Sequence, residues 1–531
     1  MLVLRASSWK NLLGVTMKHL IVCCDGTWNV PATKTNVHSL YEALAKMDSA
    51  GEPQLAYYVR GIGTGGGLVG KFGGGAVGLG LGKRMIDAYD WLARRYQHQD
   101  GNGEPDKIWL FGFSRGAYTA RNLAGLLTSY GLVSIPQGTR RGDRTLAEEV
   151  YEHYHQNRRR ESVWRQFPDN PFARDVTVHF LGVWDTVGSL GIPDALGLIS
   201  RFDPSKYRFY NTKLSNGIVH ARHAVALDER RGPFAPTLWD ADAWNVRNPA
   251  GAPGTTFQQV WFPGDHGSVG GAGADKGLSD GALQWMMQQA SDPHQRGTSA
   301  DGIAFTRTAN APNALGPVSP HLTRFYRRLY PRPRAVPHLL ASAGAVDESA
   351  RKRNAAGQYR QQIAFNASGR AIAQVAADEA WNETGIWLTP GTYELSAHGT
   401  WYDRALETDP LGTPVHSHVG ILRRTANLAE WLQRALRKFT RTDNALAPAA
   451  RRVLTDDAGQ DVPRMCLVGV VADGEFDPLT ELQQDHTTLK IGKSAEWEVF
   501  RNGYLYAFAN DSWLRYTNNT GSITLTVQRL R

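Results

Sequence analysis

The sequence has few cysteines and no long apolar run. Cys23, Cys24 and Cys466 are its three thiols, which excludes a disulfide framework and a four-thiolate metal site. No stretch approaches the roughly 20 consecutive apolar residues that a membrane-spanning helix requires. Lysine is also scarce, at 14 of the 59 basic residues. The net charge of +9 favours anionic partners, but it does not distinguish nucleic acid from phospholipid headgroups or acidic glycans.

The composition is that of a folded protein with more than one domain. With 42% hydrophobic and 21% charged residues the chain is not disordered, and its 531 residues exceed one domain of about 100–200 residues. Residues 1–16 contain neither a sustained apolar core nor a small-residue cleavage site, so we expect no secretory signal peptide. Met17 directly precedes an apolar run and is an alternative start to Met1. We therefore predict synthesis in the cytoplasm; if the protein acts outside the cell, separate machinery must export it.

Strands and helices alternate along the first half of the chain. This alternation predicts an α/β fold, with a mostly parallel sheet and helices on both faces. Strands are expected at 19–24, 55–60, 107–113, 176–184 and 257–263, and helices at 83–97 and 116–128.

The second half has a different pattern. From about residue 376, short β-rich runs are separated by turns and not by long helices, which predicts an antiparallel β-sandwich. We therefore expect an N-terminal extension, an α/β domain, a linker, and a sandwich with a basic helical insert. Their expected ranges are 1–17, 18–345, 346–375, 376–531 and, for the insert, 423–462.

Gly112-Phe113-Ser114-Arg115-Gly116 forms a G-x-S-x-G motif between an expected strand and an expected helix. A serine on such a sharp turn needs strained backbone angles, and the two glycines relieve the crowding around it. The helix amino terminus then offers N–H groups to a developing oxyanion. The motif predicts that Ser114 is a nucleophile, whereas the simpler alternative is a tight turn with a capping serine.

A serine nucleophile needs a base, and that base needs an orienting acid. Asp185 and His266 follow Ser114 in the chain order typical of α/β-hydrolases, and each lies just after an apolar strand. We predict that they form a catalytic triad with Ser114. The alternative is that Asp185 only caps a helix and that His266 is an ordinary loop histidine. The competing histidines lack this strand-end position; they are His179, His220, His223 and His294. The competing acids, Asp194 and Asp203, lie in loop-like stretches.

An oxyanion hole requires two N–H donors. The amide of Arg115 is predicted to be one, and Gly26 or Thr27, in the turn after the first strand, to supply the other. Asp25 is interpreted as a turn-forming residue. Gly61 to Gly82 holds 12 glycines in 22 residues, which makes a G-x-G-x-x-G match nearly automatic and does not favour nucleotide binding. Three interpretations of this segment remain open: a flap over the active site, a lipid-facing loop, or a surface excursion.

Seven blocks of the sequence stand out: CDGTWN, YVRGIGTGG, LFGFSRGAYTAR, GVWDTVGSLG, ARHAVALDERR, WFPGDHGSVGG and GLSDGALQWM. In this order, over about residues 18–330, they resemble the uncharacterised α/β-hydrolase domain family that includes the first family of type VI secretion lipase effectors. In that family the serine, aspartate and histidine of three of these blocks form a catalytic triad, which here implies Ser114, Asp185 and His266. One difference is that the family's H-S-D-V-G-G reads H-G-S-V-G-G here, so the histidine loop is expected to be held differently.

The C-terminal half is similar to the galactophilic lectin of the PA-IL type, on the strength of TGIWLTPGTYELSAHGTWYD and GYLYAFANDSWLRYTNNTGSITLTV. The resemblance implies that Asp511, Asn518 and Asn519 hold a calcium ion that bridges to a galactoside-type glycan. A turn of Asn and Asp residues is the alternative. Within the insert, residues 428–439 have apolar side chains at helical spacing beside arginines, which is typical either of packing within the domain or of an anionic membrane surface.

The resemblance implies a serine esterase, namely a phospholipase A that cleaves membrane glycerophospholipids as an antibacterial type VI effector. It implies membrane lipid as substrate, a secretion spike or adaptor and a cognate immunity protein as partners, action at a target-cell membrane and no nucleic-acid partner. The triad requires no cofactor. Two alternatives remain: an esterase for an acylated glycan or a polyester, anchored by the lectin-like domain, or a glycan-binding protein without catalysis.

Overall fold

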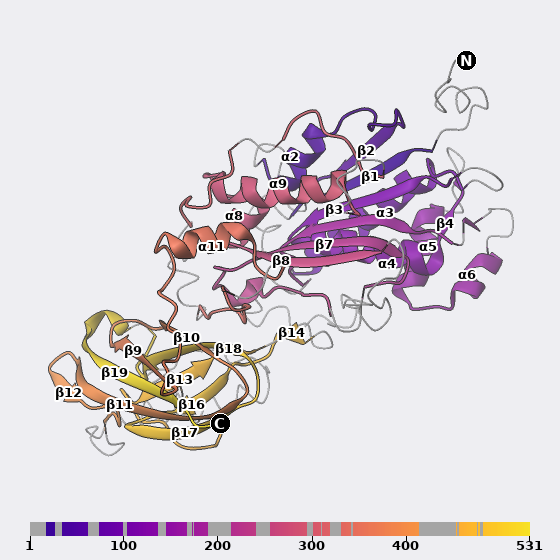
Figure 1. The fold of residues 1–531 in the computed structure, drawn as a ribbon. Coiled ribbons are helices and arrows are strands. Elements are labelled where there is room, and N and C mark those ends of the chain that lie inside the picture. Colours follow the sequence, from indigo (N-terminus) through magenta and orange to yellow (C-terminus); the bar gives the residue numbers. More distant parts are fainter. Residues whose placement is uncertain are drawn as a thin grey trace. The chain divides into compact units, whose positions relative to one another are not determined.

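The computed structural model describes two compact units, which are treated separately below (Figure 1). Among the described residues, the first unit holds those up to 226 and from 236 to 318, and the second holds 227–235 and those from 331 on. The described residues are 17–26, 34–61, 74–98, 104–135, 145–166, 172–173, 175–188, 214–240, 255–294, 301–308, 311–318, 331–340, 344–413, 453, 456–474, 476–477, 482–513 and 515–531.

The first unit is built on a six-stranded sheet in the order β2-β1-β3-β6-β7-β8. Every neighbouring pair in this sheet is parallel, which confirms the predicted α/β class. The carboxyl ends of the strands therefore share one edge, where α/β proteins place their functional groups. The strands are β1 (His19–Cys24), β2 (Gln54–Val59), β3 (Lys107–Phe113), β6 (Val178–Trp184), β7 (Ile218–Ala226) and β8 (Thr256–Phe262).

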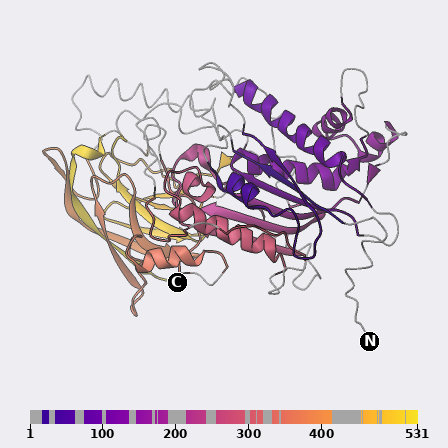
Figure 2. The ribbon, with the colours of Figure 1, turned by 90° about the horizontal axis from the view of Figure 1, so that it is seen from above.

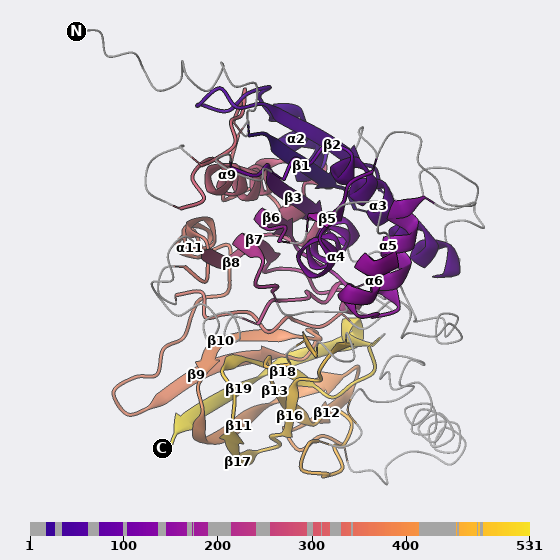
Figure 3. The same cartoon turned by 90° about the vertical axis from the view of Figure 1, so that its right-hand side faces the viewer.

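Helices cover both faces of the sheet, and successive residues of one strand show why. In β1, Leu20 and Val22 pack in the cluster that holds α3, α4 and α5, whereas Ile21 packs in the cluster that holds α2 and α9. Figure 3 shows these two groups of helices on opposite faces of the sheet. Side chains alternate along a strand, so a strand covered on both sides is apolar throughout. The helices are α2 (Asn36–Ala43), α3 (Gly74–Ala93), α4 (Arg115–Tyr130), α5 (Leu146–His155), α6 (Arg160–Gln166), α8 (His266–Gly270) and α9 (Gly277–Ser291).

Helix α3 starts nine residues earlier than predicted, inside the glycine-rich segment. Gly82 has a packing role there, because a Cβ at this position would lie 2.7 Å from the hydroxyl of Tyr151 on α5. Residues 62–73 lie outside the described part of the chain. Two short strands of the first unit, β4 (Leu132–Val133) and β5 (Phe172–Ala173), pair with each other in an antiparallel way. The 3₁₀ turn η5 (Gly232–Phe234) follows β7 in the chain and belongs to the second unit.

The second unit contains two antiparallel sheets, drawn mainly in orange and yellow in Figure 2. One has the order β10-β18-β13-β16, and the other has β12-β11-β19-β9 with β17 paired to β11. A single buried cluster includes Leu505 of the first sheet and Leu525 of the second, so the sheets face each other as in a sandwich. The longer strands are β9 (Arg370–Ala376), β10 (Asn382–Leu388), β11 (Gly391–Asp403), β13 (Leu467–Val471), β16 (Thr487–Lys490), β17 (Ser494–Val499), β18 (Gly503–Ala509) and β19 (Asn519–Arg529).

The stretch 346–375, predicted to be a linker, contains regular structure. Helix α11 (Glu348–Ala355) begins there after Asp347, whose side chain caps it by accepting from the Ser349 amide at 2.9 Å, and β9 supplies the sandwich with a strand from residue 370. The predicted extension and most of the predicted insert lie outside the described residues. The remaining short elements are β12 (Leu406–Thr408), β14 (Phe476–Asp477), β15 (Leu482–Gln483) and η6 (Tyr516–Asn518).

Candidate active site

Ser114 occupies the sharp turn between β3 and α4. Its backbone angles are φ 57° and ψ −123°, a combination that is strained for a residue with a side chain. Although Ser114 is the N-cap of α4, its hydroxyl makes no capping hydrogen bond. The hydroxyl instead lies 2.9 Å from Nε2 of His266. The turn therefore presents the hydroxyl to a base rather than to its own helix.

The two glycines of the motif are needed because backbone segments approach closely. A Cβ on Gly116 would lie 2.1 Å from the carbonyl oxygen of Cys24, at the end of β1. A Cβ on Gly112 would lie 2.5 Å from the carbonyl oxygen of Gly116. Both distances are far below any real contact, so these glycines allow β1, β3 and α4 to meet beside Ser114.

Asp185 directly follows β6, the strand next to β3. Its backbone is also strained, with φ 36°, and its amide donates to the carbonyl of Ala224 at 2.7 Å. The side chain is fully buried: Oδ1 accepts from the amide of Ala226 at 2.9 Å, and Oδ2 lies 2.6 Å from Nδ1 of His266. The carboxylate is therefore fixed on one side by β7 and on the other by the histidine.

His266 is the first residue of the short helix α8, which follows β8. A carboxylate only accepts hydrogen bonds, so Nδ1 of the ring donates to Asp185, which leaves Nε2 of a neutral ring to accept from the Ser114 hydroxyl. The ring packs on Phe113 with centroids 4.7 Å apart. Only 6% of His266 is exposed. Such an arrangement can remove the serine proton and stabilise the resulting imidazolium.

The histidine loop is held by a capping aspartate that precedes the histidine. Asp265 is the N-cap of α8 and accepts from the amide of Ser268 at 2.7 Å. From α2, the Asn36 amide group donates to the carbonyl of Val269 at 2.9 Å. The loop that differs from the family pattern is thus anchored on both sides of His266.

The competing histidines are engaged elsewhere. Nε2 of His223 accepts from the amide of Thr186 at 3.2 Å. The other three lie together, with ring centroids 5.2 Å apart for His179 and His220 and 4.5 Å apart for His220 and His294. His179 and His220 belong to the first half of their strands, at the opposite end from Ser114 and Asp185. The competing acids at 194 and 203 lie outside the described residues.

Of the predicted oxyanion donors, Arg115 is the best placed. It is the first residue of α4, and an amide in the first helical turn has no partner within its helix. The Gly26 amide donates to Oδ1 of Asp25 at 2.7 Å, which is the turn-forming contact expected of this aspartate. Thr27 lies outside the described residues.

The residues predicted to bind calcium in the second unit do lie close together, but an arginine is among them. Arg464 pairs through Nη2 with Oδ2 of Asp403 at 2.6 Å and with Oδ1 of Asp511 at 2.9 Å. The Asn518 side chain donates to Asp403 at 2.6 Å, and that of Asn519 to the carbonyl of Ala377 at 3.2 Å. The one guanidinium already pairs with both carboxylates and stands where a cation would bind, so the residues as they lie do not fit a calcium ion. Among the described residues, no group of three or more His, Cys, Asp or Glu could hold a metal.

This arrangement predicts that calcium leaves the melting temperature of the wild-type protein unchanged. Substituting Arg464→Met should lower the stability of the second unit by about 3–5 kcal/mol, because it leaves two carboxylates unpaired. Calcium should then raise the melting temperature of the variant. Thermal unfolding in Ca²⁺ or in a chelator measures both effects.

Lys493→Met is the matched control, because Lys493 pairs with the more exposed Asp409 at 2.8 Å and such pairs contribute at most about 1 kcal/mol. Calcium stabilisation of the wild type that disappears in Asp511→Asn would instead establish the calcium site.

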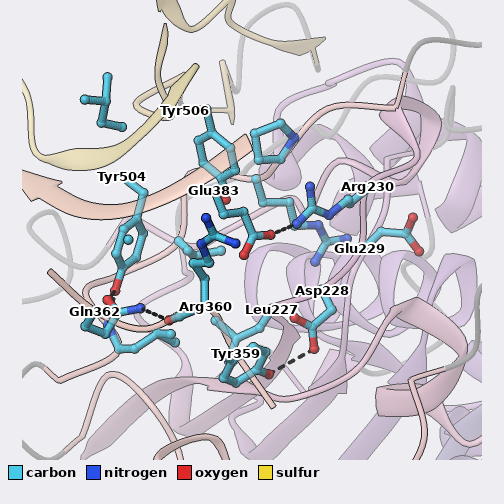
Figure 4. A pocket seen from close by; sticks show the side chains of 16 residues that line it. Leu227, Asp228, Glu229, Arg230, Tyr359, Arg360, Gln362, Glu383, Tyr504 and Tyr506 are labelled. Atoms are coloured by element: carbon cyan, nitrogen blue, oxygen red, sulfur yellow. Dashed lines mark hydrogen bonds and ion pairs between the residues drawn. The ribbon is translucent and has the colours of Figure 1, made fainter. Parts of the chain in front are cut away.

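The second unit also has a crevice of its own, of about 60 Å³ (Figure 4). Its polar side chains bind one another: the Tyr359 hydroxyl donates to Asp228 at 3.0 Å and that of Tyr504 to Gln362 at 2.6 Å, while Arg230 pairs with Glu383. Neither serine nor histidine lines it. These contacts hold distant segments of the unit together, and they offer no nucleophile beside a base.

Among the residues that the structure describes, there is no helix with the length and apolar character that crossing a bilayer requires.

Comparison with known proteins relates the first unit to one family. Residues 18–289 match the family described as "T6SS, Phospholipase effector Tle1-like, catalytic domain". The uncharacterised protein YEL023C of Saccharomyces cerevisiae is 32% identical over 240 residues, which are 41% of this chain and 32% of that protein. This chain thus spans about a third of the length of that curated relative.

Two solved structures are similar over parts of the chain. The Tle1 effector bound to the VgrG spike of the type VI secretion system is 19% identical over 48% of this chain and 51% of its own, with a TM-score of 0.27. The PllA-like lectin that forms the N-terminal domain of EclA is 16% identical over 32% of this chain and 99% of its own, with a TM-score of 0.16. The match over residues 18–289 covers half of the chain, and the chain accordingly belongs to the Tle1-like family of type VI secretion phospholipase effectors.

Proposed function

We propose that the protein is a serine esterase that hydrolyses acyl esters of membrane glycerophospholipids, as a phospholipase A delivered by a type VI secretion spike. The observation that carries the proposal is the buried hydrogen-bonded chain from Ser114 through His266 to Asp185, within the stretch that matches the phospholipase effector family. Family membership supports the lipid ester and the secretion route, and the geometry of the three residues supports the chemistry.

In the proposed reaction, His266 takes the proton of Ser114 as the serine oxygen attacks the ester carbonyl. Asp185 keeps the imidazole in the required tautomer and stabilises its positive charge. The amide of Arg115 donates to the oxyanion of the tetrahedral intermediate. His266 then protonates the leaving lysophospholipid alcohol, and water, deprotonated by the same histidine, releases the fatty acid from Ser114.

The experiment joins active-site labelling with product analysis. A fluorophosphonate probe should modify Ser114, as identified by peptide mass spectrometry, because an activated serine attacks such a phosphorus centre. Vesicles of phosphatidylethanolamine and phosphatidylglycerol should yield equal amounts of fatty acid and lysophospholipid, and labelling should abolish this release.

Labelling of Ser114 together with turnover of a short-chain ester, but without lysophospholipid from either vesicle, would keep the esterase and refute the phospholipase. The search for a substrate would then move to acylated glycans and polyesters. Absence of both labelling and turnover would refute the esterase.

A further inference from the structure

A small cavity lined by three arginines lies beside the Ser114 turn. Arg60 directly follows β2, Arg84 is on α3, and Arg115 is the residue after Ser114. The cavity measures about 10 Å³, which is the space one water-sized atom needs. It can therefore receive a single oxygen atom of a larger group, but not the whole of it.

The charge around this cavity is strongly positive. Asp25 is the one acidic residue in the lining, and burial raises the pKa of its carboxyl. Its oxygens also accept hydrogen bonds from the Thr35 hydroxyl at 2.7 Å, from the Gly26 amide at 2.7 Å and from the Tyr58 hydroxyl. Three arginines thus line the cavity together with one carboxyl that is already bound by three donors, and an anion is the ligand that suits this lining.

The cavity lies on the same edge of the sheet as Ser114, one strand away. β1, whose last residue Cys24 lines the cavity, is paired with β3, and Cys24 is opposite Gly112 in the register. The backbones of Cys24 and Gly116 are in close approach, as described above. An anion bound here would therefore lie at the same sheet edge as the ester that Ser114 attacks.

A glycerophospholipid has an anion in that position, because its phosphodiester is separated from the nearer ester by only the glycerol carbons. We propose that Arg60, Arg84 and Arg115 form the subsite for the lipid phosphodiester, with one phosphoryl oxygen in the cavity. Guanidinium groups bind phosphate oxygens with two parallel N–H donors, which fixes orientation as well as charge. The inference rests on the proposed function and adds a means by which the enzyme would prefer phospholipids to neutral acylglycerols.

The test uses monomeric short-chain lipids, so that attraction to a charged membrane surface does not enter. Dihexanoyl phosphatidylcholine and dihexanoylglycerol carry the same esters, but only the first has a phosphodiester. The full-length wild type should have the higher kcat/KM on the phospholipid. In Arg60→Gln and in Arg84→Gln the ratio of the two kcat/KM values should fall about tenfold, mainly through a higher KM for the phospholipid.

Lys83→Gln is the matched control, because Lys83 is an exposed cation next to Arg84 on α3 and does not line the cavity. It should leave the ratio unchanged. Arg60→Lys and Arg84→Lys retain the positive charge and should keep part of the preference for the phospholipid over the neutral lipid. Circular dichroism of every variant shows whether the fold is retained.

A ratio that is unchanged in both glutamine variants, or that falls equally in Lys83→Gln, would overturn the subsite. In that case the wild type would still hydrolyse both lipids, and the proposed esterase would stand. Hydrolysis of neither lipid by the wild type would instead overturn the proposed function, and the subsite with it.

Discussion

Replacing Ser114 by alanine should lower the rate of acyl-ester hydrolysis on the order of 10⁴- to 10⁶-fold, to the level that binding and oxyanion stabilisation alone provide. The substitution removes the attacking oxygen but leaves His266 fixed by Asp185 at 2.6 Å and by the Phe113 ring. Fold and lipid binding should therefore persist. Fatty-acid release from phosphatidylglycerol vesicles by the purified protein measures the effect.

Asp185→Asn should lower kcat for acyl-ester hydrolysis by about 10⁴-fold, because the amide of the asparagine can donate to Nδ1 and so stabilise the wrong tautomer of His266. Ser129→Ala is the matched control: Ser129 is an exposed serine on α4, the helix that Ser114 begins. Activity of Ser114→Ala within tenfold of the wild type, with Ser129→Ala unaffected, would exclude the serine mechanism.

The elements around Ser114 could be predicted because their signals are local. β3 has the bounds read from the sequence, Lys107–Phe113, since a continuous apolar run ends there at a glycine–serine turn. The predicted proximity of Ser114, Asp185 and His266 agrees with the hydrogen bonds between them, while their catalytic roles remain predictions. Parallel strands bring their carboxyl ends to one edge, so residues that follow such strands meet even when they are far apart in sequence.

β7 was not predicted, because its sequence IVHARHAVA places polar side chains in a buried strand. Arg222 is fully buried there, and its guanidinium binds the Gln289 side chain at 2.6 Å and the Thr256 hydroxyl at 2.8 Å. Those partners come from other elements, and the hydrophobic pattern of β7 itself does not reveal them. A buried polar residue is tolerated where distant partners satisfy it, which one sequence alone does not show.

The arginine at the predicted calcium site shows the same limit. The Asp and Asn residues near 511–519 are easily recognised as an oxygen-rich turn. Arg464, which neutralises Asp511, lies 47 residues earlier in the chain, and only the tertiary fold brings the two together. Local patterns thus indicate which ligands a turn can offer, but not whether another side chain already occupies them.

Buried histidines should make the protein unstable in mild acid. Burial lowers the pKa of His179 to about 3, and the positive charge of Lys107 is the second cause. Burial lowers the pKa of His220 to about 2, and the neighbouring His179 is the second cause there. Burial also lowers the pKa of His19. Asp301, which faces this cluster, opposes the shifts only weakly. In the unfolded chain each histidine titrates near 6.5, so below that pH the unfolded state binds more protons.

The sign follows from this difference: the stability is fully present above about pH 6.5 and is lost progressively as the pH falls towards the lowered values. For His220, which is fully buried, the loss is about 2 kcal/mol at pH 5, and because the folded pKa lies far below 5 the amount does not depend on its exact value. With several such histidines in the first unit the losses add, so the urea midpoint should fall steeply between pH 7.5 and pH 5.

His220→Gln distinguishes this cause from general acid effects. Glutamine can still bond the Thr256 hydroxyl, which lies 2.8 Å from Nδ1 of His220, but it does not titrate, so the variant should lose less stability between pH 7.5 and pH 5 than the wild type. His98→Gln, at an exposed histidine, should keep the full dependence. A wild-type midpoint that is the same at both pH values would show that these histidines are not held neutral by burial. Equal slopes for His220→Gln and the wild type would place the acid sensitivity elsewhere, because a group that contributes to the slope must flatten it when it is removed.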